Sequence, residues 1–148
     1  MSITKQNLQM FLFAERRDIM LFHSFNTQDE RRAFGGSDFS ELQFCEHKSG
    51  TSIKRIVNKI EYWRNDSLYI SGDDWESFYK NYKNVFKNGT YNNLKNGEID
   101  LCGINYYSPE QVEEMIKAIE EKKPKDYIIV LEWLNKAKEF NGVYILGV

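Results

Sequence analysis

The sequence is short of the residue types that most enzyme and metal sites require. It has two histidines, two cysteines and two prolines among its 148 residues. Neither His23 nor His47 has a ligand partner at helical or hairpin spacing, so no metal site is predicted. Cys45 and Cys102 lie far apart in apolar runs, which is typical of free thiols in a reducing compartment. Phosphate-binding glycine motifs are also missing, so no cofactor is expected.

Long apolar runs are absent too. The apolar run at residues 10–14 is far too short to span a bilayer, and the first residues lack a signal-peptide pattern. We therefore expect a cytoplasmic protein with no membrane partner. No long basic stripe is present either, which argues against a nucleic-acid partner.

What the chain does have is material for one core. Hydrophobic residues make up 41% of it and aromatic residues 15%, which is enough for a single domain over residues 1–148. Apolar periodicity predicts an α+β fold: an antiparallel or mixed sheet built from hairpins, with about three helices packed on it. The predicted strands are residues 39–47, 56–63, 67–71, 98–107 and 143–146. Residues 9–25 favour two strands around a charged turn, with a helix as the alternative, and residues 26–37 are expected to form a surface loop.

Two of the predicted helices have clear boundary signals. Asp73 and Asp74 are good N-cap residues, and an aromatic stripe follows them at helical spacing before Asn88-Gly89 ends the helix. The stripe consists of Trp75, Phe78, Tyr79, Tyr82 and Phe86. The second helix begins at Ser108-Pro109 with Gln111 completing a capping box, and ends at Lys122-Lys123-Pro124. A third helix is predicted over residues 126–139, with Ile128, Leu131, Trp133 and Leu134 largely buried.

Charge is distributed unevenly along the chain. Residues 1–64 carry ten Lys/Arg and eight Asp/Glu, whereas residues 65–148 carry ten and fourteen. Two windows, 65–79 and 96–116, contain no basic residue. Their carboxylates could create a negative potential that suits a basic protein partner. Alternatively, acids at helix N-termini simply complement the helix dipole.

Aromatic residues stand beside these acids, as they do in protein interfaces. Tyr106 and Tyr107 are adjacent in a predicted strand and should point to opposite faces, so one of them is a candidate for exposure. We therefore predict a partner-binding surface without catalytic residues. Its members are Asp66, Asp73, Asp74, Glu76, Glu98, Asp100, Tyr106, Tyr107 and Glu110.

Two catalytic alternatives remain open at this point. Cys45 and His47 would share a strand face, which is the geometry of a thiolate–imidazole pair. Asp73, Asp74 and Glu76 could hold Mg²⁺, although helix capping is the better explanation of their position.

Two strand-to-helix transitions in the middle of the chain give a resemblance. They are Leu68-Tyr69-Ile70-Ser71-Gly72-Asp73-Asp74-Trp75 and Ile104-Asn105-Tyr106-Tyr107-Ser108-Pro109-Glu110-Gln111. With the aromatic helix, they resemble the small single-domain immunity proteins encoded beside toxins of bacterial contact-dependent growth inhibition and related polymorphic toxin systems. The resemblance implies a cytoplasmic protein that binds one cognate toxin domain, often a basic nuclease and here expected to be a ribonuclease or deoxyribonuclease. A phage or plasmid accessory binding protein is the remaining alternative, and the sequence leaves the oligomeric state open.

Overall fold

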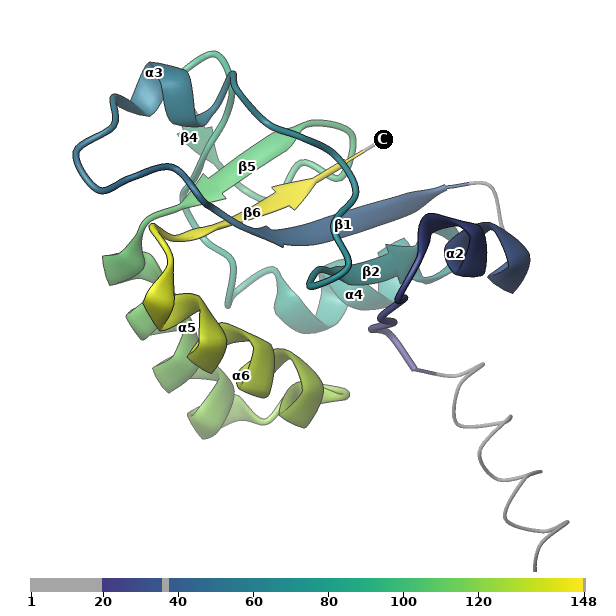
Figure 1. The fold of residues 1–148 in the computed structure, drawn as a ribbon. Helices are drawn as coiled ribbons and strands as arrows, with labels where there is room; N and C mark the ends of the chain where they lie inside the picture. The colour runs from purple at the N-terminus through teal and green to yellow at the C-terminus, as the bar shows by residue number, and fades with distance from the viewer. Residues whose placement is uncertain (1–19, 36–37, 148) are drawn as a thin grey trace, which may run out of the picture.

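A computed structural model describes residues 20–35 and 38–147. These residues form a single α+β domain around a six-stranded antiparallel sheet with the strand order β2-β1-β6-β5-β3-β4 (Figure 1). The strands are β1 (Phe39–Phe44), β2 (Leu68–Ser71), β3 (Gly89–Thr90), β4 (Asn96–Gly97), β5 (Ile104–Tyr107) and β6 (Val143–Leu146). The helices are α2 (Gln28–Phe34), α3 (Ile53–Ile56), α4 (Trp75–Tyr82), α5 (Pro109–Lys122) and α6 (Tyr127–Lys136), with 3-10 turns η1 (Gly72–Asp74) and η2 (Ala137–Glu139). The predicted fold class is confirmed, with two short helices more than expected.

Both faces of the sheet are covered, because alternate side chains of β1 pack into different clusters. Leu42 and Phe44 point into the main core, which they share with buried residues of α4, α5 and α6. Phe39 points to the other face and packs with Tyr69, Phe25 and Phe34. Figure 1 shows α5 and α6 side by side on one side of the sheet, with α3 on the opposite side.

The aromatic stripe lies against the main core, as its spacing predicted, but α4 ends at Tyr82 and not at the predicted Asn88-Gly89, so Phe86 lies beyond the helix. Phe78, Tyr82 and Phe86 are fully buried, whereas Trp75 and Tyr79 are only half-buried. Phe78 and Tyr82 stack with their ring centroids 5.3 Å apart. The outer edge of the stripe therefore reaches the surface at Tyr79.

Helix α5 begins and ends where the sequence placed it. The Ser108 hydroxyl accepts from the Gln111 backbone N–H, and the Gln111 side chain accepts from the Ser108 backbone N–H, which completes the capping box. Lys123 ends the helix in the left-handed region, with a φ of 46°. Helix α6 buries Trp133 and Leu134, but Ile128 is 58% exposed and Leu131 is half-buried, so the predicted burial is wrong for these two.

The loop predicted at residues 26–37 and the strand predicted at residues 56–63 are wrong. Thr27 caps α2 by accepting from the Glu30 backbone N–H, which gives the charged segment after it a helix start. Ser52 caps the short helix α3 in the same way, through the backbone N–H of Arg55. Between α3 and Ser67 the chain forms no strand. Its backbone groups instead bond the side chains of Glu41 and Gln43 on β1.

The other strand predictions are confirmed in part. The segment predicted as a strand over residues 98–107 is a strand only from Ile104, because the Asn105 side chain bonds both backbone groups of Asp100 and holds a loop there. The prediction for residues 9–25 lies largely outside the described residues. Within the described part, His23 makes one isolated antiparallel bridge, to Tyr69.

Candidate functional site: an acidic face beside helix α4

Three of the predicted carboxylates lie where β2 passes into α4. Asp73 and Glu76 are exposed and Asp74 is half-buried. The expected explanation, that the aspartates cap the helix, is not what the structure shows. Ser71 accepts the hydrogen bond from the Asp73 backbone N–H, and Asp74 makes no side-chain cap. These carboxylates are therefore not engaged in capping α4.

Glu98 joins this group through Tyr79, and Asp100 lies two residues after Glu98 in the same loop. The Tyr79 hydroxyl donates to Glu98 Oε2 over 3.0 Å, and Tyr79 lies one turn after Glu76 on α4. The hydrogen bond to Glu98, with the charge of that carboxylate, raises the pKa of the Tyr79 phenol. Tyr91 donates to the Glu98 carbonyl and fixes the loop. We call Asp73, Asp74, Glu76, Glu98 and Asp100 the acidic face.

The charges of Asp100 and Glu98 also act on the phenol of Tyr91. Burial is the largest cause that raises the pKa of its phenol, and the charges of Asp100 and Glu98 add to it. Asp100 itself accepts from the Cys102 backbone N–H, which orients its carboxylate. The loop before β5 therefore holds two carboxylates in a defined arrangement.

No ion pair between described residues neutralises the acidic face. The ion pairs among residues 20–35 and 38–147 join Arg32 to Asp29 and Arg64 to both Glu46 and Glu61. None involves the five carboxylates. Two lysines stand close by: Lys83 Nζ lies 5.7 Å from the centroid of the Tyr79 ring, and Lys80 lies one turn after Glu76 on α4.

Four of the predicted site residues do not join the acidic face. Asp66 lies by α6, where its backbone carbonyl accepts from Trp133 Nε1, and Glu110 lies in the first turn of α5. Tyr106 and Tyr107 are 4% and 0% exposed, so the prediction that one of them is at the surface is wrong. Alternation does send them to opposite faces of β5, but both faces are covered.

Contacts on the two faces explain this burial. The Tyr106 hydroxyl donates to the Asn141 carbonyl on one side, and the Tyr107 hydroxyl donates to the Phe86 carbonyl on the other. Tyr107 belongs to the main core, whereas Tyr106 packs with Tyr144 and Cys45. Both tyrosines stabilise the fold and are removed from the binding surface.

The side chains of Cys45 and His47 have different hydrogen-bond partners. The Cys45 thiol is fully buried and donates to the Tyr144 hydroxyl over 3.4 Å. Burial is the main cause that raises the pKa of this thiol, which disfavours the thiolate that a nucleophile needs. His47 Nε2 donates to the Lys59 carbonyl oxygen over 2.6 Å. The structure therefore gives no support to a Cys45–His47 catalytic pair.

This arrangement predicts a large difference between the two thiols. We expect a disulfide reagent to label the exposed Cys102 at least about 100-fold faster than Cys45 near neutral pH, because only a thiolate reacts. The Cys45 rate should still rise at pH values where an ordinary thiol has reached its plateau, since its pKa is raised. Time courses on Cys102→Ser and Cys45→Ser variants measure each thiol alone. Equal labelling rates at neutral pH would show that Cys45 is as reactive as an exposed thiol.

The Mg²⁺ alternative is also unsupported. Among the residues that the structure describes, no group of three or more His, Cys, Asp or Glu side chains is placed to hold a metal ion. Asp73, Asp74 and Glu76 follow one another around the start of α4 and do not converge. In the same part of the chain, no helix combines the length and apolar character needed to cross a membrane.

One functional-site feature was missed from the sequence: Glu41 on β1. Its side chain is 5% exposed and accepts hydrogen bonds from the backbone N–H groups of Trp63 and Arg64. The hydroxyl groups of Ser67 and Tyr69 and the Gln43 amide also donate to it. A charged residue inside a predicted strand was the available signal, but its partners lie up to 28 residues away.

Comparisons of the chain with protein-family models, with curated proteins and with solved structures found no match. What the protein does must therefore be inferred from its own residues.

Proposed function

We propose that this protein binds a cationic protein domain through the acidic face, and that it acts as an immunity protein that neutralises a cognate toxin in the cytoplasm of the producing cell. The observation that carries the proposal is that the five carboxylates of the acidic face, of which Glu98 is tied to α4 through Tyr79, form no ion pair with a described residue. Natural surfaces normally intersperse the two signs of charge. A cluster left unpaired is suited to a partner that supplies the cations.

A basic nuclease fits this surface because its own cleft must attract phosphate groups. Carboxylates held at fixed positions can occupy the same cationic cleft and keep nucleic acid out. Their field also speeds encounter with a basic partner, which matters for an inhibitor that must bind before the toxin acts. The resemblance to immunity proteins of contact-dependent growth inhibition systems supports the same choice of partner.

Charge reversal tests the proposal. The partner examined is the product of the neighbouring gene, expressed with and without this chain. We expect the chain to bind it and to relieve its toxicity, and we expect the variant Glu76→Lys, Glu98→Lys, Asp100→Lys to bind at least about 100-fold more weakly and to lose protection. Affinity is measured by calorimetry at two salt concentrations, because a charge-driven complex weakens as salt increases.

Helix α5 provides a matched control. Glu113, Glu120 and Glu121 are exposed carboxylates on α5 that are not part of the acidic face. Changing these three to Lys alters the net charge equally, so binding should fall by less than about threefold if position matters and not total charge. Equal losses in the two triple variants would refute the acidic face as the binding surface. Binding without relief of toxicity would instead favour an accessory binding protein.

A further inference from the structure

A second cation-binding arrangement lies on the other face of the sheet, and the chain fills it with its own residue. The guanidinium carbon of Arg31 on α2 lies 5.6 Å from the ring centroid of Phe39, 5.8 Å from that of Trp63 and 5.9 Å from that of Tyr69. These distances are within the range of cation–π attraction. We call Phe39, Trp63 and Tyr69 the aromatic cage.

Arg31 is held in the cage by the rings and not by an acid. No described carboxylate forms an ion pair with it, and its Nε atom is buried without a hydrogen-bond acceptor. A buried guanidinium donor without an acceptor is unfavourable and calls for an explanation. Arg31 therefore fits its place through charge and shape while leaving a polar group unsatisfied.

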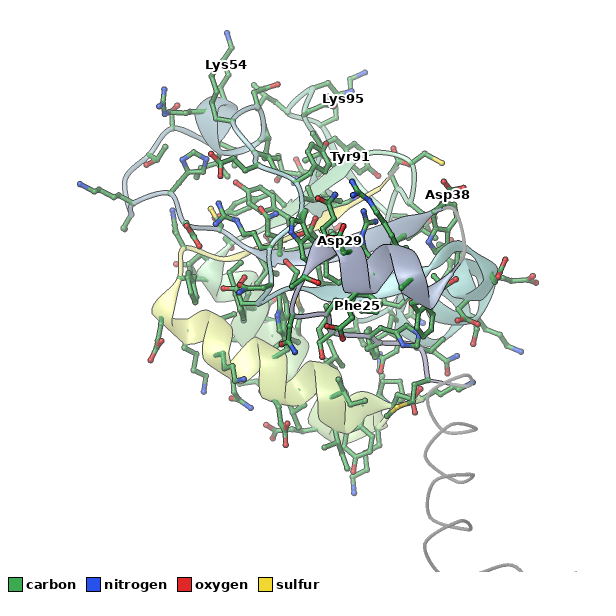
Figure 2. The ribbon with its side chains drawn as sticks, turned by 45° about the vertical axis from the view of Figure 1, so that its right-hand side comes forward. Phe25, Asp29, Asp38, Lys54, Tyr91 and Lys95 are labelled. Carbon is green, nitrogen blue, oxygen red and sulfur yellow. The ribbon has the colours of Figure 1, made fainter. Side chains whose placement is uncertain are left out.

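Helix α2 is held against the rest of the chain by Phe34, whose ring centroid lies 5.6 Å from that of Phe25 and 6.1 Å from that of Phe39. None of the residues of α2 is buried, and its capping bonds stay within the segment, from Thr27 to Glu30 and from Glu30 to the Asn26 backbone. The ion pair that α2 makes with described residues, between Arg32 and Asp29, is exposed. Figure 2 shows α2 lying in front of the sheet, with Phe25 below it and Asp38 beside its end. Moving this short helix aside would cost the ring contacts of Phe34, but no fully buried side chain of α2 would be exposed.

The space beside Arg31 indicates what kind of group would enter. A cavity of about 460 Å³ opens there, and its walls include Tyr62, Trp63, Asp38 and Glu41. Asp38 and Glu41 outnumber Arg31, so an anionic guest would meet net repulsion. If Arg31 left, the charged groups of the wall would all be negative. The cavity therefore favours a cation.

The cage is also presented in a fixed form. Trp63 has a φ of 69°, a left-handed conformation that is strained for a tryptophan, and its backbone N–H donates to Glu41 Oε1 over 2.8 Å. Tyr62, the preceding residue, is 58% exposed and also lines the cavity. Tyrosine, tryptophan and arginine are the residues most enriched at the energetic centres of protein interfaces.

We propose that the aromatic cage is a guanidinium-binding site for an arginine side chain of the protein partner, and that Arg31 occupies it in the free chain. The inference rests on the cationic partner proposed above. Binding exchanges one guanidinium for another on the same three rings, while α2 moves aside. Arginine is preferred to lysine because a planar guanidinium stacks on aromatic rings, whereas an ammonium group is compact and strongly hydrated.

The cage can be tested without the partner. The probe is N-acetyl-arginine amide, and the readout is the indole N–H signal of Trp63 in a ¹H–¹⁵N spectrum. We expect Arg31→Ala to bind the probe at least about 10-fold more tightly than the wild-type chain does, because the cage is vacated. The signals of Trp75 and Trp133, which lie outside the cage, should not move. Arg32→Ala, which removes the neighbouring exposed arginine, should behave like the wild type.

The analogue N-acetyl-citrulline amide has nearly the same shape as the probe but no charge, so it shows whether binding depends on the charge. It should not shift the Trp63 signal in either chain. If Arg31→Ala does not fold, Arg31→Gln removes the charge while retaining most of the side chain, and the same order of affinities is expected. A folded variant that shows no shift of the Trp63 signal, or that responds equally to citrulline, overturns the cage.

Partner binding then distinguishes the source of the arginine. Trp63→Leu should weaken partner binding about 10-fold, and Arg31→Ala should strengthen it. If the probe binds but Trp63→Leu leaves partner affinity unchanged, the partner is not the source and the assignment is refuted. The acidic-face variants retain the cage, so failure of one test does not imply failure of the other.

Discussion

Replacing Glu41 with alanine is expected to lower the free energy of unfolding by about 4 kcal/mol. Five donors converge on this buried carboxylate, and among them are the backbone N–H groups of Trp63 and Arg64. Alanine would leave the Trp63 backbone N–H and the Ser67 hydroxyl without this acceptor, whereas the Arg64 backbone N–H would keep the Tyr69 hydroxyl as its acceptor. The two backbone groups belong to a segment without strand pairing, so no neighbouring ladder can take over their bonds.

Urea unfolding followed by far-ultraviolet circular dichroism measures the effect, and Glu46→Ala is the control. Glu46 pairs with Arg64 at the surface over 2.9 Å, and such exposed pairs contribute about 0.5 kcal/mol. A loss below about 1 kcal/mol for Glu41→Ala would mean that the segment after α3 rearranges to satisfy its own donors. In that case Glu41 would not be what holds Trp63 in its position in the aromatic cage.

The second large effect is expected at Gly142, in the turn that leads into β6. Its φ is 89°, and a Cβ placed there would lie 2.1 Å from the Tyr107 carbonyl oxygen. Gly142→Ala must therefore adopt an unfavourable backbone conformation and also separate the turn from β5. We expect a loss of about 3 kcal/mol or more in the free energy of unfolding.

Gly50 separates these two causes. It has almost the same φ, 90°, but a Cβ there would meet nothing within 4 Å. Gly50→Ala should cost only the conformational term, about 1 kcal/mol. Thermal or urea unfolding of the two variants gives the comparison, and similar losses for both would show that the contact with Tyr107 is relieved at little cost.

These predictions concern the same structural problem as the candidate site. The sheet is covered on both faces, so its polar groups must be satisfied internally. On the face away from α5, this is done by Glu41, Gln43 and the tyrosines. The aromatic cage is connected to this network by the hydrogen bond from Trp63 to Glu41. The acidic face is connected to helix α4, on the opposite side of the sheet, by the hydrogen bond from Tyr79 to Glu98.

The sequence alone determined those features whose causes are local. The start of α5 follows from three preferences within four residues, those of Ser108, Pro109 and Gln111, and the burial of Phe78 and Tyr82 follows from spacing on one helix. The fold class and the final strand were also predictable, because alternation and turn residues lie close together in the chain. It also indicated the windows from which the five carboxylates of the acidic face come.

Only the tertiary structure decided which of the predicted residues reach the surface and which come together. Alternation places Tyr106 and Tyr107 on opposite faces, but whether a face is open depends on elements distant in sequence that pack over it. Glu98 meets α4 through one hydroxyl, and Glu41 meets Trp63 across 22 residues. Such contacts are absent from any local pattern, since they exist only after the sheet has ordered its strands.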